Sequence, residues 1–73
     1  MKPYANHHGN SGVTEYEITE NSISIIFKYG NKIYTYSNSV TGKHRVDTMK
    51  ELAVSGHGLS TYIAQHKKEL AFT

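Results

Sequence analysis

The sequence predicts an α+β domain in which a three-stranded antiparallel β-meander is followed by two short α-helices packed on one face. Three observations carry this prediction. Apolar and polar residues alternate over residues 22–28, a Gly30-Asn31 pair follows, and after Val46 the apolar spacing becomes helical. Alternation is typical of a strand with one buried face, and both Gly and Asn tolerate the positive φ of a tight hairpin. The sheet is therefore expected to precede the helices along the chain.

The three strands are expected at residues 13–19, 22–28 and 32–37. The first is the least regular, with its apolar residues at Val13, Tyr16 and Ile18. The second has the clearest period of two, and the third contains the run Ile-Tyr-Thr-Tyr, which is rich in β-forming residue types. Short connections between them predict an antiparallel meander with one packed face and one open face.

Residues 37–42 are rich in Ser, Asn, Thr and Gly and are expected to form a loop. A first helix follows, because Val46, Met49, Leu52 and Ala53 lie on one helical stripe. Gly56 is placed to end it in the left-handed conformation. A second helix is expected to begin near Leu59 or Ser60 and to carry Lys67 and Lys68 in its last turns.

The domain is expected to span residues 13–73, and residues 1–12, which are mostly polar, are expected to form a flexible N-terminal tail. The core should draw on apolar residues of all three strands and both helices. Its expected members are Ile18, Ile23, Ile25, Phe27, Tyr34, Tyr36, Met49, Leu52, Ala53, Leu59, Tyr62 and Ile63.

Composition excludes several classes of protein. The chain has 73 residues, of which 37% are hydrophobic, and it contains no cysteine. A disulfide scaffold, a cysteine zinc site and a thiol enzyme are therefore excluded. No apolar run approaches the roughly 20 residues that span a bilayer, and no signal-peptide core follows Met1. We expect a cytoplasmic protein that does not enter a membrane.

Catalytic and metal-binding patterns are weak. Two of the five histidines are adjacent in the sequence, at residues 7–8, and no carboxylate stands at metal-ligand spacing from them. Ser55 or Ser60 beside His57 makes no triad, and Gly56-His57-Gly58 fits a connector between helices better than a phosphate loop. We expect no catalytic residue, no metal and no cofactor.

The tyrosines of the hairpin leave two alternatives open. Tyr34 and Tyr36 are two residues apart and so share one face of their strand. Facing the helices, they would be large core residues with hydroxyls at the rim. Facing solvent, they would form a stacking platform for single-stranded bases, flanked by Lys28 and Lys32. The small core favours the first alternative, and Tyr29 is then the ring expected to stay exposed.

Charge is unevenly distributed, although the net charge is only +2. Residues 1–20 carry one lysine against three glutamates, whereas residues 21–73 carry seven Lys and Arg against three acidic residues. A cluster of basic residues and one aromatic is expected to bind nucleic acid or another partner. Its expected members are Lys28, Tyr29, Lys32, Lys43, Arg45 and Lys50.

Short motifs are spread over residues 22–63. They are Phe27-x-x-Gly30, Tyr34-x-Tyr36, Leu52-Ala53-x-Ser55-Gly56 and Ile63. Together they resemble the KTSC domain, a short module named after the lysyl-tRNA synthetase C-terminal domain and also found as a stand-alone bacterial protein. Three residues separate the glycine turn from the Tyr-x-Tyr motif here, and the family's Val-Pro after that motif is absent. The resemblance implies a bacterial α+β module for which RNA binding has been suggested.

Together these features predict a small non-catalytic module that binds RNA or another polyanion. The alternative is a protein–protein interaction module or small homodimer with no nucleic-acid affinity. A chain of this size gains stability by covering its open sheet face or a strand edge with a second copy.

Overall fold

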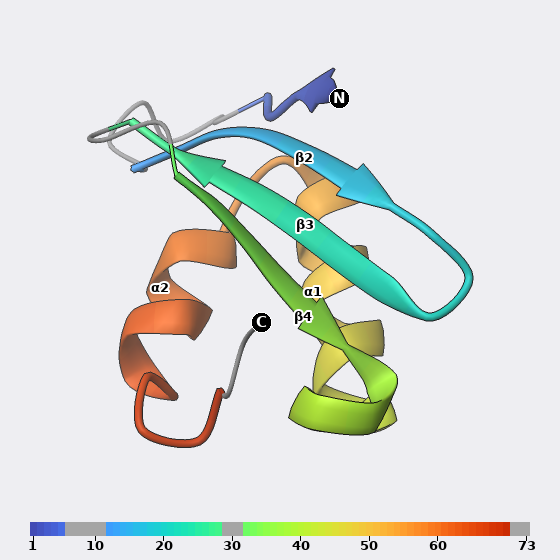
Figure 1. The fold of residues 1–73 in the computed structure, drawn as a ribbon. Coiled ribbons are helices and arrows are strands. Elements are labelled where there is room, and N and C mark those ends of the chain that lie inside the picture. The colour runs from blue at the N-terminus through green and yellow to red at the C-terminus, as the bar shows by residue number, and fades with distance from the viewer. Residues whose placement is uncertain (6–11, 29–31, 71–73) are drawn as a thin grey trace.

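The computed structural model describes residues 1–5, 12–28 and 32–70. Its elements run in the order β1 (Lys2–Pro3), β2 (Val13–Ile18), β3 (Ser22–Phe27), β4 (Ile33–Ser37), η1 (Asn38–Gly42), α1 (Lys43–Ser55) and α2 (Leu59–Gln65). The strands form one antiparallel sheet in the order β1-β2-β3-β4, and both helices cover the same face of it (Figure 1). The α+β class is confirmed, but the sheet has four strands rather than three.

The extra strand comes from the segment predicted to be a tail. β1 pairs with β2, and the Tyr4 backbone N–H then donates to the Thr14 carbonyl at 2.9 Å. The Tyr4 side chain is buried, and its hydroxyl accepts a hydrogen bond from the Leu59 backbone N–H at 3.3 Å. These partners are distant in sequence, so local composition does not reveal them. Residues 6–11 of the predicted tail lie outside the described residues.

The centre of the sheet explains which way the tyrosines face. Ile23 pairs with Tyr36 and Ile25 pairs with Tyr34, and both isoleucines are 0% exposed. Directly opposed residues of two strands share a face, so both tyrosines face the helices and Tyr36 is only 4% exposed. The open face carries the alternate residues, such as Ser24. The core alternative for the tyrosines is therefore the one observed.

The helices follow the predicted stripe. Val46, Met49 and Ala53 of α1 are buried, and Leu52 packs beside them. Gly56 ends α1 with φ of 82°, and its N–H donates to the Leu52 carbonyl at 3.1 Å. That conformation suits glycine because it has no Cβ.

Two helical boundaries differ from prediction. The predicted loop at residues 37–42 contains η1, a π-helical turn capped by the Ser37 hydroxyl, which accepts from the Val40 N–H at 3.3 Å. α2 ends at Gln65, so Lys67 and Lys68 lie in the turns after it. Short polar side chains that bond to nearby backbone explain the first difference.

The core differs from prediction in several members. Five residues predicted to lie within it are only partly buried and pack against it, namely Phe27, Tyr34, Leu52, Tyr62 and Ile63. Ile18 is 39% exposed because it ends β2, beyond the two residues that β1 covers. In its place, four apolar residues absent from the predicted core are buried. They are Tyr4, Val13, Val46 and Leu70.

A matched pair of isoleucines tests this arrangement. Ile25→Ala should lower the free energy of unfolding by about 2–5 kcal/mol, because it leaves a cavity at the centre of the sheet. Ile33→Ala, on the open face where the side chain is 51% exposed, should cost much less. Urea unfolding of the two variants measures the difference, and equal losses would contradict the assignment of the two faces.

Candidate nucleic-acid interface

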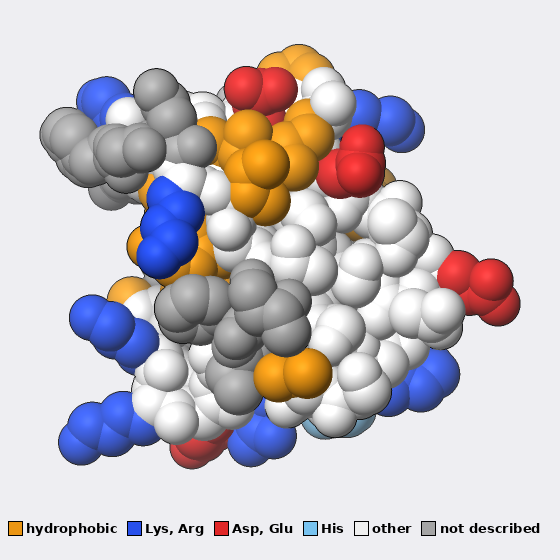
Figure 2. All heavy atoms as spheres, in the orientation of Figure 1, with side chains coloured by type: hydrophobic (Ala, Val, Ile, Leu, Met, Phe, Trp, Pro, Cys, Tyr) orange, Lys and Arg blue, Asp and Glu red, His pale blue; other side chains and the backbone are white. Residues whose placement is uncertain are grey.

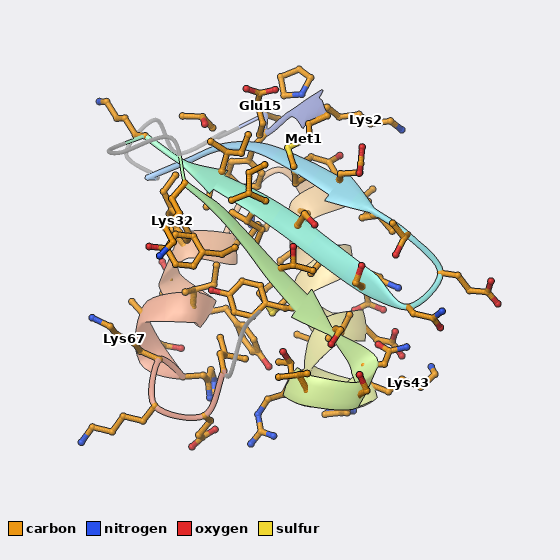
Figure 3. The ribbon with its side chains drawn as sticks, in the orientation of Figure 1. Met1, Lys2, Glu15, Lys32, Lys43 and Lys67 are labelled. Atoms are coloured by element: carbon orange, nitrogen blue, oxygen red, sulfur yellow. The ribbon has the colours of Figure 1, made fainter. Side chains whose placement is uncertain are left out.

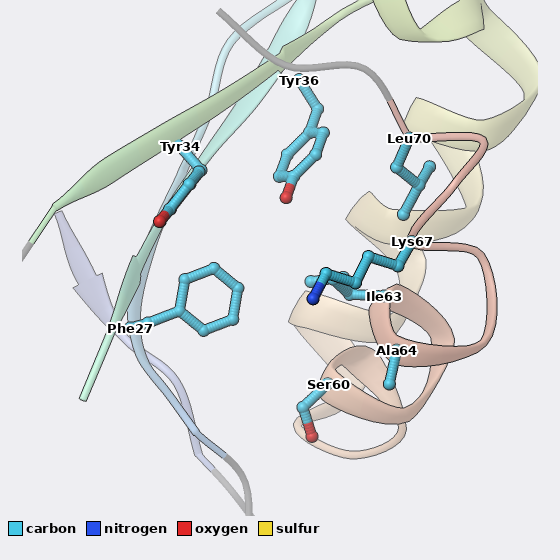
Figure 4. A pocket seen from close by; sticks show the side chains of 8 residues that line it. All are labelled: Phe27, Tyr34, Tyr36, Ser60, Ile63, Ala64, Lys67 and Leu70. Carbon is cyan, nitrogen blue, oxygen red and sulfur yellow. The ribbon is translucent and has the colours of Figure 1, made fainter. Parts of the chain in front are cut away.

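A pocket of about 360 Å³ opens between the ends of β3 and β4 and the second helix. The sheet supplies its aromatic wall, and α2 with the turn after it supplies the opposite wall (Figure 4). The volume lies within the range of small-ligand sites. The lining residues are Phe27, Tyr34, Tyr36, Ser60, Ile63, Ala64, Lys67 and Leu70.

The aromatic wall follows directly from strand register. Phe27 ends β3 and Tyr34 lies near the start of β4, both on the helix-covered face. Their rings meet edge to face with centroids 5.3 Å apart, a favoured geometry for aromatic pairs. Both remain half-buried, because α2 has only seven residues and does not fill this end of the sheet.

Three chemically different groups converge on the space inside. The Phe27 ring, the Tyr36 hydroxyl and the Lys67 ammonium all point into it (Figure 4). Burial raises the pKa of the Tyr36 phenol, and the neighbouring Tyr34 raises it further. The Tyr36 hydroxyl therefore stays protonated at physiological pH and can both donate and accept a hydrogen bond.

The rim of the pocket is cationic. The Lys32 ammonium lies 5.5 Å from the centroid of the Tyr34 ring, within cation–π distance. Within the described part of the chain neither Lys32 nor Lys67 forms an ion pair, and no carboxylate is among the lining residues. The site therefore favours an anion with an apolar body.

The basic residues predicted on the first helix belong to a different part of the surface. Lys43 lies on the opposite side of the molecule from Lys32 and Lys67 (Figure 3). It donates to Asp47 at 2.7 Å, and this hydrogen bond is the main reason why the pKa of the Asp47 carboxyl is lowered. Lys50 is hydrogen-bonded to the carbonyl of Glu20 at 3.2 Å.

The structure thus divides the predicted site. It places Lys32 beside the pocket and Lys43, Arg45 and Lys50 on α1, whereas Lys28, which follows the end of β3, is not among the lining residues. Tyr29 lies outside the described residues. Sequence reasoning missed the lining residues Phe27 and Ile63 as part of a site, because their apolar character was fully explained by the core. Lys67 was predicted only as a residue in the last turns of the second helix.

Glu69 joins the turn after α2 to the first helix. Its carboxylate lies 3.2 Å from His66 Nδ1 and 3.1 Å from the Arg45 guanidinium. The hydrogen bond from His66, followed by that from Arg45, lowers the pKa of the Glu69 carboxyl. The next residue, Leu70, is buried and lines the pocket. The ion cluster therefore positions one wall of the site.

Ser55, which was considered for catalysis, lies at the end of α1, and the histidine pair at residues 7–8 lies outside the described residues. The Ser55 hydroxyl donates to the Leu52 carbonyl at 2.9 Å, in keeping with its place at the helix end. Among residues 1–5, 12–28 and 32–70, no three His, Asp or Glu side chains are grouped so that they could hold a metal ion. The two described α-helices of the chain are too short and too polar to cross a bilayer.

No protein-family model, curated protein or solved structure matches this chain. The resemblance to the KTSC domain therefore remains a prediction from the sequence, and the function must be argued from the site itself.

The Glu69 cluster predicts a pH dependence. A lowered carboxyl pKa in the folded state stabilises the fold above the ordinary glutamate pKa, and this contribution is lost as pH falls through the folded value. Glu69→Gln should therefore lower Tm at pH 7 but not at pH 3. Glu51→Gln, an exposed position on α1, is the control and should change Tm little at either pH. A Glu69→Gln effect of equal size at both pH values would contradict the role given to its charge.

Proposed function

We propose that this chain is a small non-catalytic module that binds RNA at the lysine-rimmed pocket between the sheet and α2. The observation that carries the proposal is the convergence of aromatic rings and lysines on one pocket. Aromatic rings provide stacking surfaces for bases, and lysines provide contacts to phosphates. Neither component alone would favour nucleic acid over other ligands.

The distribution of charge supports an approach of RNA from this side. Several Lys and Arg side chains gather along the left edge of the molecule on the side of α2, with others at the top right and lower right, and acidic side chains flank the apolar patch at the top of the view (Figure 2). Glu15 and Glu17 are exposed on β2, on the far side of the sheet from β4. A polyanion is thereby attracted to the pocket side and repelled from the β2 side.

The lining chemistry supports binding rather than catalysis. Its polar groups are two phenols, one serine hydroxyl and one ammonium, with neither histidine nor carboxylate among the lining residues. A general base near neutral pH is usually one of those two types. Because the pKa of the Tyr36 phenol is raised, the hydroxyl stays neutral and serves as a hydrogen-bonding group rather than as a charged base.

Matched charge removal tests the proposal. Lys32→Gln with Lys67→Gln should weaken binding of single-stranded RNA and reduce the slope of log K against log salt by roughly 1.4, since each phosphate contact contributes about 0.7. Lys43→Gln with Lys50→Gln removes the same charge from α1 and should leave most of the slope. Fluorescence anisotropy over a salt series measures both, and equal effects of the two pairs would contradict a localised site.

A protein-interaction role is the second candidate, and the open face of the sheet favours it. Ile33 is 51% exposed and stands opposite Ile26, which in turn stands opposite Glu15. Two neighbouring isoleucines on an open face form an apolar strip that a second copy of the chain can cover. Sedimentation equilibrium distinguishes the candidates. A salt-insensitive dimer abolished by Ile33→Lys, without RNA affinity, would replace the RNA proposal.

A further inference from the structure

We infer that the pocket holds one unstacked base of a single-stranded nucleic acid, while Lys32 and Lys67 contact the phosphates that flank it. The inference rests on the proposed function and adds which part of the ligand enters the pocket. It separates recognition of an unpaired base from simple attraction to a polyanion.

The shape of the pocket favours a flat group. Phe27 and Tyr34 form one wall from the sheet, and Ile63 and Ala64 form the other wall from α2 (Figure 4). The space between two packed layers admits a ring inserted edge first. Ala64 leaves room on the helix side because its side chain is a single methyl group. A base inserted there would have an aromatic neighbour on one side and apolar side chains on the other.

Polar groups within the pocket favour a base over the apolar side chain of a peptide. The Tyr36 hydroxyl and the Lys67 ammonium both point inward. An aliphatic or phenyl group would cover the Lys67 ammonium without providing a hydrogen-bond partner, which costs free energy. The edge of a nucleobase carries ring nitrogens and carbonyl oxygens that accept hydrogen bonds from both groups.

The position of the lysines favours a continuous strand. Lys32 precedes β4 on the sheet side, and Lys67 follows α2 on the helix side, so the two cations flank the opening from opposite walls. A strand crossing the opening can place one phosphate near each lysine while its base turns inward. A duplex cannot do this without unpairing, because its bases are already stacked and paired.

Three ligands separate the components of this model. The probes are a ten-nucleotide oligoadenylate, a ribose-phosphate chain of the same length without bases, and adenosine monophosphate. Oligoadenylate should bind about tenfold more tightly than the abasic chain at equal salt, as expected for stacking of one base. Adenosine monophosphate should bind far more weakly than oligoadenylate, because it lacks the second phosphate.

A pocket-filling variant tests where the base lies. Ala64→Leu adds volume at an exposed helical position that lines the pocket. It should remove the preference for oligoadenylate over the abasic chain while the salt slope stays unchanged. Gln65→Leu is the control, because it adds a leucine to the same helix outside this pocket and should keep the preference. Circular dichroism confirms that both variants fold.

The outcomes are distinguishable. A preference for bases that Ala64→Leu removes and Gln65→Leu keeps supports the inference. Equal, salt-sensitive binding of oligoadenylate and the abasic chain overturns it but leaves polyanion binding intact. Adenosine monophosphate binding as tightly as oligoadenylate overturns the assignment to a strand. Failure of every probe to bind overturns the inference together with the proposed function.

Discussion

The fold depends on burial of one face of the central strand. Ile23 and Ile25 of β3 are completely covered because both helices close over them, and each is paired with a tyrosine of β4. Side chains alternate between the two faces of a strand, so this register determines the face on which each remaining residue of the sheet lies. A shift by one residue would expose the isoleucines and bury hydroxyl groups such as that of Ser24. The direction of Tyr34 and Tyr36, and with it the pocket, follows from that constraint.

The pocket exists because the two helices that cover the sheet have unequal lengths. α1 has 13 residues and covers the middle of the sheet, whereas α2 has seven and leaves the rings of Phe27 and Tyr34 half-covered. Apolar surface beside Lys32 and Lys67, which form no ion pair within the described ranges, is where binding gains most, since a ligand covers the rings and meets the charges together. On α1, by contrast, Lys43 and Arg45 are already engaged with carboxylates of the same chain. Local ion pairing thus decides which basic residues remain available to a partner.

Much of the fold is predictable from the sequence, because periodicity is a local property. The alternation in β3, the stripe of α1 and the glycine that ends it were all confirmed. The strand β1 and the burial of Tyr4 were not predicted, since they arise from contacts with residues far along the chain. The site was predicted only in part for the same reason. Lys32 was identified by its type, but the wall formed by Ile63 depends on how α2 meets the sheet.

We expect ligand to enter the pocket rather than bind the open face of the sheet, and the methyl groups of two isoleucines report on these two surfaces. Ile63 lines the pocket and Ile33 lies on the open face. Titration of a methyl-labelled protein with oligoadenylate, followed by methyl NMR, measures the two directly. We expect the Ile63 methyl resonance to shift and to show nuclear Overhauser contacts to base protons, while the Ile33 methyl resonance stays unchanged. A shift of Ile33 with Ile63 unmoved would contradict it.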